Sequence, residues 1–319
     1  MKIQKQLAVI FAVFIGFALF NYSIYSCFTV RYIDKSDSLM IEKSIELDKY
    51  LPFDENSKIV QCKSDFQLTG RLPVLDGATA LFPVYSAFMN TVYPPNSCEF
   101  DGRDFIAESS LQKRGTIGAY EALINGAADI IFVAEPSQKQ LQYAKDAGKE
   151  LVLVPIGYEA FVFIVNSKNP AESLSVEQIK GIYSGEYTNW QQLGGEKAPI
   201  NALQRIENSG SQTAMVSFMG DLPMKTPRVA NLFGKSIGYS FRYYVSDISG
   251  KENVKMLDVN GVYPSEENIR NGTYPVTECF YAVYIAGNSN ENVELLINWI
   301  LADEAQAIID ETGYVNLKR

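Results

Sequence analysis

The stretch Arg205-Ile206-Glu207-Asn208-Ser209-Gly210-Ser211-Gln212-Thr213 carries the strongest indication of how this 319-residue chain folds and what it binds. Met215, Phe218 and Met219 follow at helical spacing, so the stretch is predicted to open a helix with a buried apolar side. The start of a helix has unpaired backbone N–H groups and about half a positive charge, which suits a dehydrated oxyanion. Arg205 would add a cation that can donate two parallel hydrogen bonds.

Two other segments offer the same chemistry. Asp76-Gly77-Ala78-Thr79-Ala80 follows a short apolar run, and Arg114-Gly115-Thr116-Ile117-Gly118 opens another predicted helix. Each supplies backbone N–H groups and a hydroxyl at a predicted helix start. Ser and Thr are also ordinary helix caps and Gly is ordinary in turns, so one such segment alone is weak evidence. Three of them can converge on one ligand.

Short apolar runs alternate with helical segments along the body of the chain. The expected strands are Leu72–Leu75, Ile130–Val133, Leu151–Ile156, Phe161–Val165, Ile237–Val245 and Phe280–Ile285. The expected helices are Pro83–Thr91, Ile117–Asn125, Gln138–Ala147, a segment after Ser175, Ser265–Arg270 and Asn292–Glu311. This alternation predicts an α/β fold, a sheet covered by helices.

Length and composition narrow the function classes. The chain is long enough for two lobes with separate cores, and a cleft between lobes is a common place for a ligand. Its net charge of −9 argues against a nucleic-acid surface, which requires a basic face. The absence of His removes the commonest general base and catalytic metal ligand. The four cysteines show no metal-binding spacing, so neither a metal nor another cofactor is expected.

The N-terminus indicates export. Lys2 and Lys5 precede an apolar run, and residues 6–30 carry no charge over a length that can span a bilayer. Because no small-x-small cleavage site follows, we expect residues 1–30 to remain as a membrane anchor, with the body outside the cytoplasm. A lipoprotein attached through Cys27 is the alternative. Residues 31–57 are expected to form a stalk.

Two further cysteines flank the first of the three segments. Cys62 and Cys98 are the better candidates for a disulfide in an oxidising compartment. Small buried apolar residues are the other interpretation of the same pair.

The order and spacing of the three segments resemble the substrate-binding protein of the phosphate ABC transporter. The resemblance runs from about Gln67 to the C-terminus. Arg205-x-Glu207-x-Ser209-Gly210-Ser211 is similar to that family's Arg-x-Asp-x-Ser-Gly-Thr, and Gly77-Ala78-Thr79 to its first phosphate loop. Gly115-Thr116 matches its next helix start, and residues 174–195 are similar to its pattern ending in Ser-Gly-x-x-x-x-Trp.

This resemblance implies a type II periplasmic-binding-protein fold whose cleft binds phosphate or a similar oxyanion for an ABC transporter permease. The implied division is a first lobe of residues 58–158 and 275–319 and a second lobe of residues 159–274. The expected ligand-binding residues are Ala78, Thr79, Ala80, Thr116, Glu135, Arg205, Glu207, Ser209, Gly210 and Ser211.

One departure from the family pattern concerns the acid beside the ligand. The family has Ser-Asp-x-Pro after the strand that follows the second loop, and its Asp accepts a hydrogen bond from the protonated phosphate. Here the sequence is Val133-Ala134-Glu135-Pro136, with the acid one place later. We expect Glu135 to take this role, and a salt bridge or cap at the lobe surface is the alternative.

Two other function classes stay open at this point. An anchored oxyanion sensor or surface receptor without a transport role would show the same features. An esterase or phosphatase using Ser209 or Ser211 as nucleophile would lack a His base, and neither Gly-x-Ser-x-Gly nor a paired-carboxylate motif is present. We therefore expect a binding protein and not an enzyme.

Overall fold

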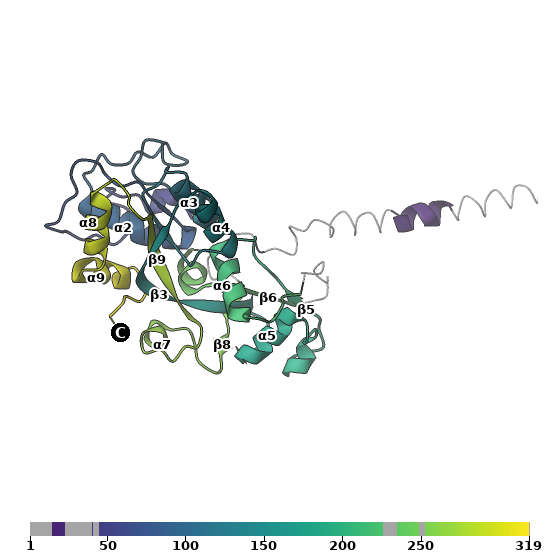
Figure 1. Cartoon of the computed structure of the whole chain (residues 1–319). Coiled ribbons are helices and arrows are strands. Elements are labelled where there is room, and N and C mark those ends of the chain that lie inside the picture. Colours follow the sequence, from purple (N-terminus) through teal and green to yellow (C-terminus); the bar gives the residue numbers. More distant parts are fainter. Residues whose placement is uncertain (1–14, 23–39, 41–44, 226–234, 249–252, 319) are drawn as a thin grey trace, which may run out of the picture.

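The computed structural model describes residues 15–22, 40, 45–225, 235–248 and 253–318. Within them the chain forms a mixed α/β fold of two lobes joined by the long strand β3 (Leu151–Asn166) (Figure 1). Buried apolar side chains form a separate core in each lobe. The predicted α/β class and two-lobed architecture are confirmed, whereas the lobe boundaries given above remain predictions.

The elements follow the predicted alternation of strands and helices. The remaining strands are β1 (Leu75–Gly77), β2 (Ile130–Val133), β4 (Ser173–Leu174), β5 (Ile200–Ala202), β6 (Lys235–Phe241), β7 (Val254–Met256), β8 (Asp258–Val259) and β9 (Thr277–Ile285). The helices are α2 (Phe82–Val92), α3 (Gly115–Ile124), α4 (Gln138–Asp146), α5 (Val176–Ser184), α6 (Gly210–Met219), α7 (Glu266–Arg270), α8 (Asn292–Ile300) and α9 (Asp303–Glu311). Short turns of helix are η2 (Leu47–Lys49), η3 (Thr79–Leu81), η4 (Trp190–Leu193) and the π-helical η5 (Tyr244–Ile248).

The first lobe has three layers around strands β1, β2, β9 and the first part of β3. Ile130 and Phe132 of β2 pack into the larger core together with residues of α2, α8 and α9. Ile131 and Val133 point to the opposite face and pack with Ala119 and other residues of α3. Side chains alternate between the two faces of a strand, so a strand covered on both sides is apolar throughout. This explains the uninterrupted apolar sequence of β2.

The second lobe is built on strands β6 and β5 and the last part of β3, with β7 paired beside β3. Its core takes Ile179 and Ile182 from α5 and Met215 and Met219 from α6. Helix α5 begins at a capping box, in which Ser175 accepts a hydrogen bond from the Gln178 amide while the Gln178 side chain accepts one from the Ser175 amide. The helical spacing predicted for both segments is therefore confirmed.

Strand β3 belongs to both lobes. Residues from Leu151 to Ala160 pair with β9, and residues from Phe161 to Val165 pair with β6. The register shifts between Pro155 and Gly157, where Pro has no N–H to donate to a ladder. We predicted two strands, Leu151–Ile156 and Phe161–Val165, and the structure joins them through this irregularity.

Other predicted elements differ in extent. The strand expected at Leu72–Leu75 is β1 and shares only Leu75 with it, and the strand expected at Phe280–Ile285 is β9 and starts at Thr277. The strand expected at Ile237–Val245 ends at Phe241, and η5 begins three residues later. The helix expected at Asn292–Glu311 is two helices, because α8 ends before Leu301 and α9 starts after Ala302. The aromatic and apolar pattern was right in the last two places, but the end of the strand and the continuity of the helix were wrong.

The folded body begins earlier than the sequence suggested. Ile45 is buried in the first core, and Leu47, Tyr50 and Phe53 pack against it. The backbone carbonyl of Tyr50 accepts a hydrogen bond from Ser86 of α2. Residues 45–57 are therefore part of the first lobe and not of the expected stalk.

The predicted membrane anchor lies mostly outside the described residues, as does Cys27. Residues 15–22 are helical. In the portions of the chain that the structure describes, no helix is both long and apolar enough to cross a membrane.

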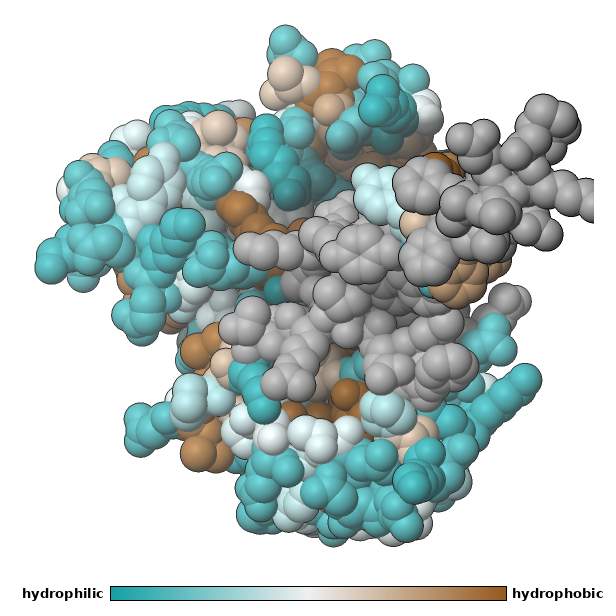
Figure 2. Space-filling view, turned by 90° about the vertical axis from the view of Figure 1, so that its right-hand side faces the viewer, coloured by the Kyte–Doolittle hydropathy of each residue, from teal (hydrophilic) through white to brown (hydrophobic). Residues whose placement is uncertain are grey.

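The two lobes present mainly hydrophilic residues on the face shown in Figure 2.

Cys62 and Cys98 are free thiols, so the predicted disulfide is wrong. Both side chains are partly buried against the first core, and the Cys62 thiol lies 3.6 Å from its neighbour's carbonyl oxygen. Burial raises the pKa of the Cys98 thiol to about 11, which keeps it protonated. They match the alternative interpretation as small core residues.

Candidate functional site

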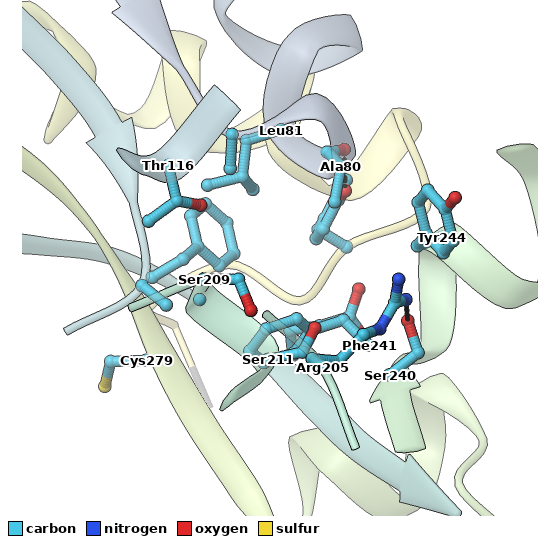
Figure 3. A pocket seen from close by; sticks show the side chains of 16 residues that line it. Ala80, Leu81, Thr116, Arg205, Ser209, Ser211, Ser240, Phe241, Tyr244 and Cys279 are labelled. Atoms are coloured by element: carbon cyan, nitrogen blue, oxygen red, sulfur yellow. Dashed lines mark hydrogen bonds between the residues drawn. The ribbon is translucent and has the colours of Figure 1, made fainter. Parts of the chain in front are cut away.

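A cavity of about 50 Å³ lies between the two lobes and collects most of the predicted residues. Seven of them line it: Ala78, Ala80, Thr116, Arg205, Ser209, Gly210 and Ser211. Figure 3 shows Thr116 and Leu81 on one side of this space and Ser209, Ser211 and Arg205 on the other. The three helix starts predicted from the sequence therefore meet at one place.

Arg205 is a buried cation, only 7% exposed. Its Nη2 donates to Ser240 Oγ at 3.3 Å, and the guanidinium carbon lies 5.6 Å from the centre of the Tyr244 ring. Its Nη1 is 3.5 Å from the carbonyl oxygen of Met40. Its buried Nε has no hydrogen-bond partner in the described structure.

No carboxylate forms an ion pair with Arg205 among the described residues. A buried charge without a counter-ion is costly, by several kcal/mol in proteins generally. The backbone holds it in place nevertheless, because the Arg205 amide donates to Gln212 Oε1 at 3.0 Å and to the Tyr239 hydroxyl at 3.1 Å. Arg205 is therefore a buried cation without a counter-ion among the described residues.

The N-terminus of helix α6 lies beside this guanidinium. Ser209 caps the helix by accepting a hydrogen bond from the Gln212 amide at 3.3 Å. Gly210 and Ser211 form the first turn, where backbone N–H groups are unpaired within the helix. The helix dipole and these N–H groups favour an anion at the same point as Arg205.

The two lobes touch at this helix start, so the cleft is closed. A Cβ on Gly210 would be 3.3 Å from Thr116 Oγ1 and 3.4 Å from Ala134 Cβ, which are both in the first lobe. Asn208 has a positive φ of 66° and turns the chain toward α4. Its side-chain oxygen accepts a hydrogen bond from Ser137 Oγ at 3.0 Å, and its carbonyl accepts one from Gln140 Nε2 at 3.2 Å.

The two loops of the first lobe are held together by Asp76. Its fully buried carboxylate accepts hydrogen bonds from the Gly77 amide at 2.8 Å, the Arg114 amide at 2.8 Å and Arg114 Nη1 at 2.6 Å. Burial raises the pKa of Asp76, while these donors act against the increase. Gly77 must lack a side chain here, since a Cβ would lie 2.5 Å from the Phe132 carbonyl oxygen. Thr116 is thereby fixed opposite α6.

Glu159 of β3 is the acidic residue that sequence reasoning missed. It lines the cavity and is 3% exposed. Its Oε1 accepts from the Ala160 amide at 2.9 Å and lies 3.4 Å from Arg242 Nε, while Oε2 accepts from the Tyr243 amide at 3.2 Å. Burial raises the pKa of Glu159 to about 7 although Arg242 lowers it. No motif surrounds this residue, so only the fold reveals it.

Three predicted residues do not line the cavity. Thr79 is buried in η3, and Glu207 is exposed. The carboxylate of Glu135 accepts a hydrogen bond from the Tyr281 hydroxyl at 3.1 Å, outside the cavity, and Ala134 lines the wall instead. The one-residue shift of the acid toward Pro136 is the reason, because it turns the side chain away from the cleft.

Leu81 directly follows the first motif and also lines the cavity. Other lining residues lie far from the three motifs in sequence, and they are Ser240, Phe241, Tyr244, Cys279, Phe280 and Tyr314. Ser240 and Phe241 end the strand β6, and Cys279 and Phe280 belong to β9. No group of three or more acidic, Cys or His side chains that could hold a metal occurs in the described portion of the chain.

The chain is similar to several known proteins. A family model described as a PBP superfamily domain matches residues 75–304. The phosphate-binding protein PstS of Borreliella burgdorferi is 26% identical over 216 residues, covering 61% of this chain and 76% of its own length. Protein SphX of Synechococcus elongatus is 24% identical over 285 residues, covering 77% of this chain and 84% of its own.

A solved structure shows the same architecture. The chain is similar to a phosphate ABC transporter substrate-binding protein from Clostridium perfringens, whose crystal structure contains bound phosphate. The two share 26% sequence identity with a TM-score of 0.58, over 76% of this chain and 98% of the other.

Proposed function

Since the chain belongs to the PBP superfamily, we propose that it captures inorganic phosphate outside the cytoplasm and delivers it to an ABC transporter permease. The relatives and the solved structure with bound phosphate support the ligand and the transport role. The single observation that carries the proposal is the buried, unpaired Arg205 at the N-terminus of α6.

The ligand would be held from both sides of the cleft. Arg205 and the first turn of α6 would bind its oxygens from the second lobe, with Ser209 Oγ close by. Thr116 and the loop of Ala78 and Ala80 would face it from the first lobe. Charge-assisted hydrogen bonds from these groups would then replace the hydrogen bonds that the oxyanion makes to water in an open cleft.

Binding would also stabilise the closed form. The contacts of Asn208 with α4 and of Gly210 with Thr116 and Ala134 exist only when the lobes meet. A ligand that bridges the lobes therefore binds the closed state better than the open one and shifts the population toward it. A closed, loaded protein is the form that a permease would need to recognise.

We also propose that residues 1–30 tether the protein to the outer face of the cytoplasmic membrane. The absence of charge between residues 6 and 30 and the leading lysines support this tether. Lipid attachment through Cys27 would serve the same purpose. Either tether keeps the captured ligand close to the permease.

We expect Arg205→Ala to weaken phosphate binding by about 2–5 kcal/mol, because the one cation among the described residues that line the cavity is lost. Isothermal titration calorimetry of phosphate into the full chain measures this loss. Arg71→Ala is the matched control, since Arg71 is 65% exposed and outside the cavity. Equal phosphate affinity of Arg205→Ala and the parent chain, with both folded, would contradict the proposal.

A further inference from the structure

Met40 is far from the candidate site in sequence, yet its backbone contacts the site twice. Its amide donates a hydrogen bond at 2.8 Å to the carbonyl oxygen of Gln204, the residue directly before Arg205. Its own carbonyl oxygen accepts a hydrogen bond from Arg205 Nη1 at 3.5 Å. This one residue from the N-terminal part of the chain therefore binds both the backbone and the guanidinium of the second lobe's cation.

The Met40 side chain lies against the second lobe at a place where a side chain is missing. It packs against the second core. A Cβ on Gly238 of β6 would clash with Met40 Sδ, whereas the nearest atom of any other residue, Ile164 Cγ1, would be at an ordinary contact distance of 3.6 Å. Gly238 has no positive φ, so its backbone conformation does not require glycine. Among these neighbours, only Met40 needs the space that Gly238 leaves.

The strand that supports Met40 also supports Arg205. Gly238 and Ser240 share one face of β6, because alternate residues of a strand point to the same side. Ser240 Oγ accepts the hydrogen bond from Arg205 Nη2 at 3.3 Å, and Figure 3 shows this contact with the Tyr244 ring nearby. Met40 and Ser240 thus each bind one terminal nitrogen of the guanidinium. A guanidinium has five N–H donors, so others, including the unpartnered Nε, are left for an anion.

We propose that Met40 is a positioning residue of the anion site. Its side chain is seated on Gly238, and its carbonyl oxygen holds the Arg205 guanidinium in place at the cavity. The inference deepens the proposed function and rests on it for the identity of the ligand. A guanidinium that is held in advance loses less side-chain entropy when the anion binds. The segment of residues 31–57, expected to be a stalk, then contributes to binding as well as to tethering.

Calorimetry of phosphate with the full chain tests the contribution of the side chain. We expect Met40→Ala to raise the Kd for phosphate about tenfold, the effect of losing one hydrogen bond to a charged group. Met256→Ala is the matched control, since Met256 also packs against the second core and does not line the cavity. An unchanged Kd in Met40→Ala, or the same increase in both variants, overturns the inference.

Gly238→Ala tests the seat from the opposite side, because the added methyl group displaces Met40 and meets no other close neighbour. We expect this variant alone to raise the Kd for phosphate as much as Met40→Ala does. In the double variant the Kd should rise no further, since the seat is already lost. Additive increases in the double variant would show that the two residues act separately, which overturns the inference.

A measurement without phosphate separates this inference from the proposed function. The Nε–H signal of Arg205 in the nuclear magnetic resonance spectrum of the ligand-free chain can be assigned by its loss in Arg205→Lys. We expect this signal to move in Met40→Ala and in Gly238→Ala but not in Met256→Ala. A signal that stays in place in the first two variants overturns the positioning role. A signal that moves in them, in a protein that binds no phosphate, supports the positioning role and overturns the proposed function alone.

Discussion

Glu159 is a buried carboxylate whose charge depends on Arg242 and on two backbone N–H groups. Arg242 in turn reaches Glu266 and the carbonyl oxygen of Gly313, so this pair connects β3, the end of β6 and the segment after α9. The carboxylate of Asp247 also acts on this region. It helps to raise the pKa of Arg242 and of the neighbouring Tyr243 and Tyr314. The pair lies where β3 passes from one lobe to the other.

The raised pKa of Glu159 gives the stability a pH dependence of known sign. The folded protein holds this proton up to about pH 7, whereas the unfolded chain releases it near 4.5. The resulting contribution is fully present below pH 4.5 and is lost as the pH rises through 7. Its upper limit is about 3 kcal/mol, at 1.36 kcal/mol for each pKa unit.

We expect the slope of unfolding free energy against pH between these values to become flatter in Glu159→Gln. Chemical denaturation at a series of pH values measures this slope. Glu266→Gln should retain it, because Glu266 is half exposed. A slope that is the same in the parent chain and in Glu159→Gln would show that Glu159 does not titrate in this range.

At the same scale, the sequence indicated the cation but not its surroundings. Arg205, Ser209 and Ser211 lie in one short motif with a known chemical logic, so their place in the cavity could be predicted. Met40 and Ser240 contact Arg205 from distant parts of the chain, and no local pattern distinguishes them. Glu135 was misplaced because a shift of one residue changes the direction of a side chain.

Among the elements, helix α6 presents its N-terminus to the proposed site. Its cap Ser209 has a counterpart in Ser175, which caps α5 in the same way and does not line the cavity. Loss of either cap should destabilise the protein by about 1 kcal/mol, because one backbone N–H group loses its partner.

We therefore expect Ser209→Ala and Ser175→Ala to lose similar stability in thermal or chemical unfolding. Only Ser209→Ala should also weaken phosphate binding, since its hydroxyl lies at the proposed site and its helix start is directed at the ligand. Calorimetry on both variants separates the two effects. Equal losses of affinity in the two variants would mean that α6 has no special role.

Elements that keep the same neighbours along their length were easier to predict from the sequence than elements that change neighbours. Strand β2 is buried on both faces and was predicted with its observed ends. Strand β3 changes partner from β9 to β6 along its length, and its sequence was predicted as two separate apolar strands. The break between α8 and α9 carries no Gly or Pro, so the apolar pattern alone could not locate it.

At the scale of the whole molecule, the closed cleft places the contacts between the lobes next to the proposed binding site. Contacts between the lobes involve Asn208, Gly210 and the N-terminus of α4, immediately beside the cavity. The N-terminal part of the chain also reaches both lobes, since the Met40 amide donates to the Gln204 carbonyl at 2.8 Å and Ile45 is buried in the first core. The contacts that close the cleft therefore lie beside the proposed binding site.

The most direct measurement of the central claim is a crystal structure of the chain grown with phosphate. We predict one phosphate ion between the closed lobes, with its oxygens within hydrogen-bond distance of the Arg205 guanidinium, the first-turn amides of α6 and the Thr116 hydroxyl. Closed lobes with phosphate bound elsewhere, and with no anion beside Arg205, would contradict the account.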